Sequence, residues 1–139
     1  MILGVDHIAI AVKNLDEAIE KYRKLLGIEP EKVEEVPQEK VKIAMFNVGG
    51  VRIELLQGLS PDSSVSKFIE KRGEGIHHIA LRVDDVVKEA ERLSSEGFKV
   101  LYSEARIVSG GERKINFIHP KTACGVLLEI VERLGVSHE

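Results

Sequence analysis

Apolar and polar residues alternate in two similar stretches, one near the start of the chain and one past its middle. Residues 5–12 read VDHIAIAV and residues 76–83 read IHHIALRV. Alternation of this kind is typical of a half-buried β-strand, in which successive side chains point to opposite faces. Both stretches place a histidine directly before Ile-Ala. The chain therefore begins two segments with the same kind of strand.

A helix is predicted after each of these strands. Residues 15–26 carry apolar side chains every three or four positions behind capping residues, and Gly27 follows them. The segment from Asp84 or Asp85 to about residue 96 has the same pattern, and Gly97 follows it. Glycine commonly ends a helix because it adopts the left-handed conformation without strain. The two segments thus share a strand, a helix and a glycine stop.

Shorter strands complete each half of the chain. In the first half, residues 28–39 are predicted to form a short strand followed by a charged loop. Two further strands are predicted over 42–48 and 51–56. In the second half they are predicted over 99–102, 114–118 and 125–131, with a loop over 103–112. A connecting helix is predicted within residues 59–72. One β-α-β-β-β unit is therefore used twice.

This repeat predicts the fold class and the domain plan. We expect an α+β fold that consists of two tandem β-α-β-β-β modules. Residues 1–139 are expected to form a single domain. Its parts are module one over about 4–58, a connector over about 59–74, module two over about 75–132, and a tail over 133–139.

Composition excludes several classes of function. The 139 residues are 43% hydrophobic and 31% charged, which is typical of a globular protein, and the net charge of -3 favours neither nucleic acid nor a membrane surface as partner. No apolar run reaches the roughly 18 residues that a membrane span needs, and no signal peptide is visible. The single cysteine, Cys124, fits a cytoplasmic protein.

Two histidines and two glutamates recur at equivalent places in the repeat. His7 corresponds to His78, and Glu54 corresponds to Glu129. Each histidine shares its strand face with alanine, which leaves room for a cavity, and each glutamate lies in an apolar run, where a lone charge is costly to bury. Any one of them could be a capped histidine or a solvent-facing glutamate. Two imidazoles and two carboxylates together suit a divalent metal with open positions for a bidentate ligand.

Other polar residues have no counterpart in the repeat. Structural or exposed roles are favoured for His77, His119, His138 and Cys124. Residues 109–111, Ser-Gly-Gly, could form an anion-binding nest or a plain turn. The nearby basic residues could face a phosphorylated ligand or form a solvated rim: Arg113, Lys114 and Lys121.

Several segments resemble the methylmalonyl-CoA epimerase family of the vicinal-oxygen-chelate (glyoxalase) superfamily. They are residues 6–12 (DHIAIAV), 73–80 (GEGIHHIA), 114–121 (KINFIHPK) and 125–129 (GVLLE). The resemblance implies that the two modules form a curved, partly closed mixed sheet around a metal site. It also implies that His7, His78, Glu129 and Glu54 bind a divalent metal there. Cobalt or manganese is the ion expected first, with nickel, zinc or magnesium as further options. It also implies a homodimer and a CoA thioester as the small-molecule partner.

The activity that this resemblance implies is an epimerase interconverting the (R) and (S) forms of methylmalonyl-CoA through a metal-stabilised enolate. Glu129 is the expected catalytic base on one face of the substrate, and Glu54 is a candidate for the other. Ile43 stands where some family members have a second catalytic glutamate. The alternatives are a glyoxalase-type isomerase (lactoylglutathione lyase), a thiol transferase, an extradiol-type dioxygenase, and a metal-free small-molecule binding protein of the same fold.

Overall fold

The structure, a computed structural model, describes residues 1–108 and 111–135 and divides into two compact units. The N-terminal unit is His7–His77, and the C-terminal unit combines Met1–Asp6 with His78–Glu139. The division falls within the two histidine-bearing strands, β1 (Ile2–Ala11) and β5 (Gly75–Val83). Each unit is described below by itself.

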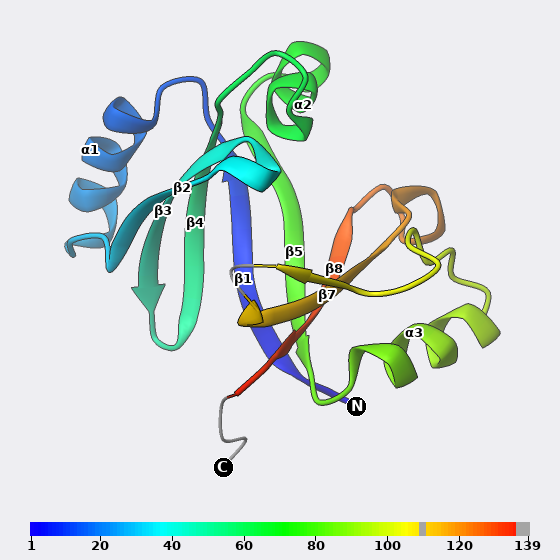
Figure 1. The fold of residues 1–139 in the computed structure, drawn as a ribbon. Coiled ribbons are helices and arrows are strands. Elements are labelled where there is room, and N and C mark those ends of the chain that lie inside the picture. Colours follow the sequence, from blue (N-terminus) through cyan, green and yellow to red (C-terminus); the bar gives the residue numbers. More distant parts are fainter. Residues whose placement is uncertain (109–110, 136–139) are drawn as a thin grey trace. The chain divides into compact units, whose positions relative to one another are not determined.

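The N-terminal unit contains four strands and two helices (Figure 1). After β1 they are α1 (Leu15–Leu26), β2 (Lys32–Val36), β3 (Val41–Val48), β4 (Val51–Gly58) and α2 (Ser64–Arg72), with a 3-10 turn, η1, at Pro37–Glu39. β4 pairs in parallel with β1 and antiparallel with β3, which in turn pairs antiparallel with β2. The hydrogen-bonded order is therefore β2-β3-β4-β1.

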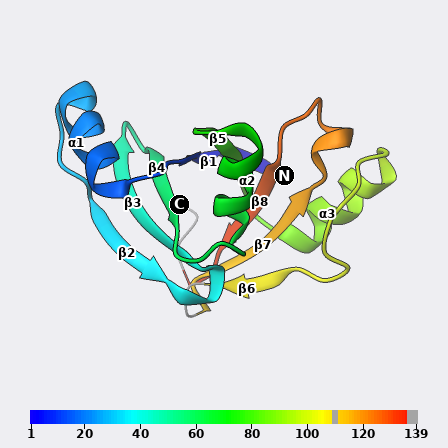
Figure 2. The same ribbon diagram turned by 90° about the horizontal axis from the view of Figure 1, so that it is seen from above.

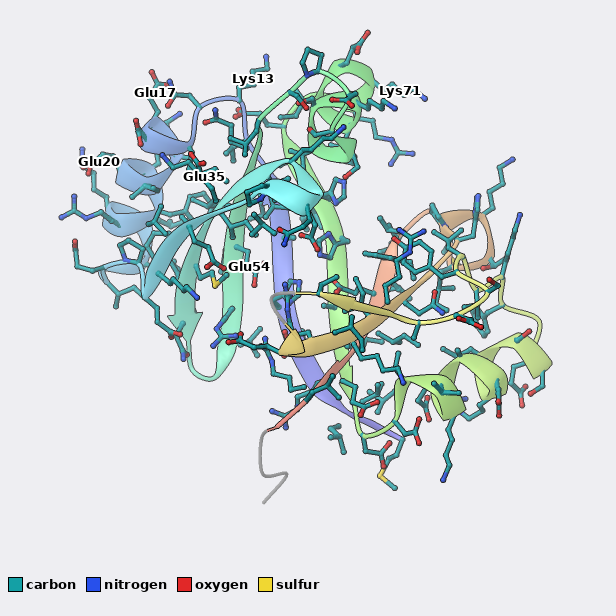
Figure 3. All side chains as sticks on the ribbon, in the orientation of Figure 1. Lys13, Glu17, Glu20, Glu35, Glu54 and Lys71 are labelled. Atoms are coloured by element: carbon teal, nitrogen blue, oxygen red, sulfur yellow. The ribbon has the colours of Figure 1, made fainter. Side chains whose placement is uncertain are left out.

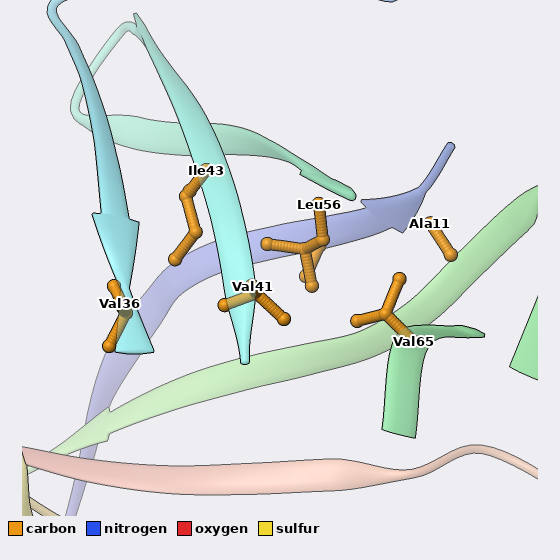
Figure 4. Packing of buried hydrophobic residues seen from close by; sticks show 7 residues of the cluster. Ala11, Val36, Val41, Ile43, Leu56 and Val65 are labelled. Atoms are coloured by element: carbon orange, nitrogen blue, oxygen red, sulfur yellow. The ribbon is translucent and has the colours of Figure 1, made fainter. Parts of the chain in front are cut away.

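Apolar side chains cover both faces of this part of the sheet. Under α1, which lies beside β3 and β4 in Figure 2, buried Phe46 and Leu55 pack with Leu15. Figure 4 shows the cluster on the other face, where Ala11, Val36, Val41, Ile43, Leu56 and Val65 pack together. Val12, just after β1, belongs to the cluster under α1, and Ile10 of β1 packs against it. The alanine face is itself packed, since Ala9 and Ala11 are 0% exposed.

The C-terminal unit repeats this arrangement. Besides the first residues of β1 and most of β5, it contains α3 (Val86–Ser95), β6 (Arg106–Val108), β7 (Arg113–Ile118), β8 (Leu128–Arg133) and a 3-10 turn, η3, at Pro120–Thr122. β8 is parallel to β5 and antiparallel to β7, which is antiparallel to β6. The order β5-β8-β7-β6 mirrors β1-β4-β3-β2. The predicted β-α-β-β-β repeat and its α+β class are confirmed.

Apolar clusters again lie on both faces. Val83 and Ile130 pack with Val86 at the start of α3. On the opposite face Ala80, Val131 and Ile115 pack together, with Phe117 and Val108 against them. Alternation along β5, β7 and β8 therefore separates a helix-covered face from a face that carries Ala80 and its neighbours.

The helix predictions hold at both ends. The side chain of Asn14 accepts from the backbone N–H of Glu17 to cap α1, and Gly27 ends that helix at φ 71°. Asp85, one of the two predicted caps, accepts from the N–H groups of Val87 and Lys88 at the start of α3. No helix in the described part of the chain is long and apolar enough to cross a membrane.

The prediction of a strand over residues 99–102 is wrong, and the edge strand β6 lies in the predicted loop. Only Val100 forms an isolated bridge, with Ile118. At Tyr102 the Asn116 side chain occupies both backbone groups: Oδ1 accepts from the Tyr102 N–H at 3.0 Å and Nδ2 donates to its carbonyl at 3.1 Å. A side chain thus replaces the strand ladder there.

Two boundaries also differ from prediction. Glu34 and Glu35 belong to β2, opposite Ile43 and Lys42 of β3, instead of a loop. β8 begins at Leu128, because Gly125 has φ 87° and lies in the preceding turn. Neither difference changes the order of elements.

Candidate functional site

His7 and Glu54 form a buried pair in the N-terminal unit. The parallel register of β1 and β4 sets Ala9 opposite Glu54 and His7 opposite Arg52, so both side chains emerge from the same face. His7 Nδ1 lies 3.7 Å from Glu54 Oε2, and the residues are 1% and 4% exposed. In Figure 3 Glu54 lies on the sheet, whereas Glu17 and Glu20 point outward from α1.

The surroundings of Glu54 are largely apolar. Met45 lies directly opposite it on β3, and Ile43 and Leu56 lie one position further along the same face. A carboxylate in such a place is unfavourable unless a proton, a cation or hydrogen bonds compensate its charge. A separation of 3.7 Å is too long for a strong hydrogen bond. The two side chains are therefore close to each other without a strong hydrogen bond between them.

His78 and Glu129 form the equivalent pair in the C-terminal unit. β5 and β8 set Ala80 opposite Glu129, as β1 and β4 set Ala9 opposite Glu54. His78 Nε2 lies 3.0 Å from Glu129 Oε1, and the residues are 8% and 4% exposed. The structure therefore places each predicted histidine beside the predicted glutamate of its own half.

Phe117 is a neighbour of this pair that sequence reasoning missed. It lies opposite Glu129 on β7, and its ring meets the His78 imidazole edge-on, with centroids 6.0 Å apart and an interplanar angle of 87°. Such a contact holds the imidazole in one orientation. The sequence signal that could have predicted this is the two-residue spacing of Phe117 and Ile115, which places both side chains on one face of the strand.

The chemistry of the two pairs fits a divalent metal. Imidazole nitrogen and carboxylate oxygen are the atoms that first-row divalent ions bind. Each pair joins one imidazole to one carboxylate, so each carries one formal negative charge when the histidine is neutral. Both carboxylates are buried, and a bound cation would remove the unfavourable burial of their charge. The four residues are therefore suited to binding the divalent metal ion that the repeat predicted.

The other polar candidates have structural roles or lie elsewhere. The His77 ring packs on Phe68 of α2, with centroids 5.3 Å apart. His119 Nδ1 accepts from the Lys121 N–H at 3.0 Å and so caps η3. Cys124 is exposed in a turn. Ser109, Gly110 and His138 lie outside the described residues.

Comparison with known proteins identifies the family. Residues 6–117 match the model described as Glyoxalase/Bleomycin resistance protein/Dioxygenase superfamily. The chain is 34% identical to the ethylmalonyl-CoA/methylmalonyl-CoA epimerase of Cereibacter sphaeroides, over 94% of this chain and 98% of that one.

Two solved structures agree with the sequence comparison. The crystal structure of methylmalonyl-CoA epimerase from Mycobacterium tuberculosis is 40% identical, with a TM-score of 0.86 over 95% of this chain and 89% of that one. A Streptomyces coelicolor methylmalonyl-CoA epimerase in complex with 2-nitronate-propionyl-CoA is 37% identical, with a TM-score of 0.89 over 97% of this chain and 100% of that one. These likenesses show the glyoxalase-type α+β fold, with a mixed sheet of eight strands. The chain belongs to this superfamily and, within it, to the methylmalonyl-CoA epimerase family.

Proposed function

We propose that this protein is a divalent-metal-dependent methylmalonyl-CoA epimerase, which interconverts the (R) and (S) forms of its substrate. The observation that carries the proposal is the buried imidazole–carboxylate pair that each unit supplies, at 3.7 Å in one and 3.0 Å in the other. Family membership and the CoA ligand of the Streptomyces coelicolor relative support the choice of substrate.

The proposed ligands are His7, Glu54, His78 and Glu129. Together their two carboxylates carry a charge that one divalent ion neutralises, and four protein ligands leave two positions of a six-coordinate ion for substrate. Cobalt or manganese is the preferred choice, and nickel, zinc or magnesium would also accept these donors. When bound, the ion would supply Lewis-acid stabilisation to the negative charge that develops on the substrate's thioester oxygen.

The protein's own part in the reaction is proton transfer at C2. This carbon lies between a thioester carbonyl and a carboxylate, so loss of its proton gives an enolate. Epimerisation requires removal of the proton on one face and its return on the other. We assign the first role to Glu129, whose backbone is positioned opposite Phe117 and Ala80.

We assign proton transfer on the other face to Glu54. Ile43, at the position where some family members have a second glutamate, is 4% exposed within an apolar cluster and cannot carry a proton. Its cross-strand partner is Leu56, two residues along β4 from Glu54. Glu54 is therefore the carboxylate best placed to act in its stead.

We also propose that residues 1–139 act as one domain, with modules over about 4–58 and 75–132, and that the protein works as a cytoplasmic homodimer. Three apolar side chains at the start of β1 support a contact between subunits, because each is 38–42% exposed: Ile2, Leu3 and Val5. Light scattering on the purified protein would test this, and a monomer at all concentrations would contradict it.

The decisive experiment is exchange of the C2 proton in deuterated buffer. Protein loaded with cobalt should incorporate deuterium into methylmalonyl-CoA and convert a single epimer at C2 into a mixture of both. Glu129→Gln should lower the rate by about 10²–10⁴-fold, because general acid–base catalysis contributes that much. Glu17→Gln, on the exposed face of α1, is the matched control. Absence of exchange together with lactoylglutathione lyase activity would replace this proposal with the glyoxalase alternative.

Metal analysis tests the ligand set independently of turnover. His78→Ala should lose the bound ion, whereas His119→Ala, which removes only the cap of η3, should retain it. A wild-type protein that binds no divalent ion would instead favour a metal-free binding protein of the same fold.

A further inference from the structure

Four arginines share one face of the C-terminal unit, the face opposite α3. Arg82 lies opposite Val131 in the β5–β8 pairing, and Arg113 lies opposite Arg133 in the β7–β8 pairing. Arg106 of β6 lies opposite Ile115. Since residues opposite each other in a ladder emerge on the same side, these side chains surround Val131 and Ile115. We call this set the arginine face: Arg82, Arg106, Arg113 and Arg133.

The arginine face continues the surface that carries the His78–Glu129 pair. Glu129, Val131 and Arg133 alternate along β8, as Phe117, Ile115 and Arg113 do along β7. Arg133 is four positions beyond Glu129, which corresponds to roughly 13 Å along an extended strand. A carboxylate–imidazole pair and a cationic region thus lie at two ends of one strip of sheet.

Acidic residues compensate this charge only in part. Arg133 donates to both carboxylate oxygens of Asp6, from Nε at 3.0 Å and from Nη2 at 2.8 Å. Arg82 and Arg106 are exposed, and within residues 1–108 and 111–135 neither has a carboxylate within 4.0 Å.

Arg106 is also held in place. Its guanidinium lies over the Tyr102 ring, 3.7 Å from the centroid, and Tyr102 in turn meets Phe117 edge-on. Stacking restricts the side chain and leaves the edge of the guanidinium available to donate hydrogen bonds. Arg106 thus presents cationic donors in a fixed orientation, which suit a phosphate oxygen better than a mobile lysine would.

We infer that the arginine face binds the phosphate groups of the CoA moiety, with Arg82 and Arg106 as the principal contacts. This inference rests on the proposed function, which makes the substrate a CoA thioester. The pantetheine arm has about as many backbone bonds as four extended residues, so it spans roughly 15 Å. Arg82 and Arg106 both lie level with Val131, two residues along β8 from Glu129, so an arm of this length can reach them from the reacting thioester.

The test compares methylmalonyl-CoA with methylmalonyl-pantetheine, which lacks the 3′-phosphoadenosine diphosphate portion and therefore all of the phosphate groups. In Arg82→Glu and Arg106→Glu the preference for the CoA thioester, expressed as a ratio of kcat/KM values, should fall about tenfold or more, since a charge-assisted contact is worth at least that factor. Arg82→Gln and Arg106→Gln should show the same direction with a smaller loss.

Lys114→Glu is the matched control. Lys114 follows Arg113 on β7 but lines a cavity of about 790 Å³ on the α3 side, together with Ala90 and Asn116. The same charge reversal on this other face should change the preference less than threefold. An equal loss in Lys114→Glu, or an unchanged preference in both arginine variants, would overturn the inference.

Calorimetric titration with CoA itself separates this inference from the proposed reaction. Wild-type protein should bind CoA, and Arg82→Glu should weaken binding about tenfold or more whether or not the protein is an epimerase. If the protein epimerises methylmalonyl-CoA but Arg82→Glu and wild type bind CoA equally, the inference fails and the function stands. If no epimerisation occurs and arginine-dependent CoA binding remains, the function fails and the phosphate site stands.

Discussion

The ion pair between Asp6 and Arg133 should contribute measurably to folding, because it is largely removed from solvent. It joins the first strand to the last, with hydrogen bonds of 3.0 and 2.8 Å. The Asp6 side chain is 6% exposed and the Arg133 side chain 23%. Asp6→Asn keeps the shape of the side chain and removes the charge that faces the guanidinium.

The magnitude follows from burial. Removing one partner of a fully buried pair costs about 3–5 kcal/mol, because the other charge stays in a low-dielectric site. Arg133 reaches solvent with about a quarter of its side chain, so water would screen part of the exposed charge. We therefore expect a loss of about 2 kcal/mol, or roughly 6–8 °C in Tm for a chain of this length.

Urea unfolding followed by circular dichroism would measure this loss, and a double-mutant cycle with Arg133→Met would isolate the pairwise part. Glu29→Gln is the control, since it breaks a pair of the same chemistry, Arg23 Nε to Glu29 Oε2 at 2.7 Å, that is exposed. Exposed pairs contribute about 0–1 kcal/mol. An Asp6→Asn protein within 0.5 kcal/mol of wild type, or a loss no larger than that of Glu29→Gln, would refute the reasoning.

Two further predictions concern packing and pH. Gly58→Ala should destabilise the chain by about 1–3 kcal/mol, because a Cβ would meet the hydroxyls of Ser66 and Ser63. Gly75→Ala, with open space around it, should stay near wild type, and urea midpoints would show the difference. Hydrogen bonds from Arg92 and the terminal ammonium lower the pKa of Glu89. The stability that Glu89 contributes is therefore present above its unfolded pKa and lost as pH falls through the lower folded value. Acid unfolding of Glu89→Gln should lack this component, and an unchanged acid profile would contradict the assignment.

Local signals in the sequence predicted the helices well. The bounds of α1 were predicted at residues 15–26 and hold there, because Asn14 and Gly27 act within one turn of the helix ends they define. Ser63 caps α2 in the same way, accepting from the Ser66 N–H. Interactions of this kind depend on neighbours within about four residues, so the order of residues is sufficient to predict them.

Strand edges were predicted less well. Residues 99–102 have the alternation of a strand, but Asn116 satisfies the backbone groups of Tyr102 with its side chain and β6 forms further along instead. Nothing in the local pattern distinguishes these outcomes, because the competing hydrogen-bond partner lies fourteen residues away in sequence. An edge strand is held on one side only, so such competition decides its position.

The candidate site likewise has features that the sequence predicted and features that only the packing determines. The repeat alone singled out His7, Glu54, His78 and Glu129, and the structure sets each histidine beside the glutamate of its own half. The sequence did not determine that His7 approaches its partner through Nδ1 and His78 through Nε2, since side-chain rotation depends on packing. The expected cavity beside the alanines was also wrong in part, because Ala9 is packed into the cluster of Ile43 and Leu56.

By itself, the sequence determined the repeated order of strands and helices, the helix ends and the four residues of the candidate metal centre, all from periodicity and internal comparison. Tertiary structure alone decided that Asp6 would meet Arg133 across 127 residues and that the arginines of β5, β6, β7 and β8 would share one face. The physical reason is register. A shift of one residue between strands turns every side chain to the other face, and only the packing of the whole sheet selects among the possible pairings.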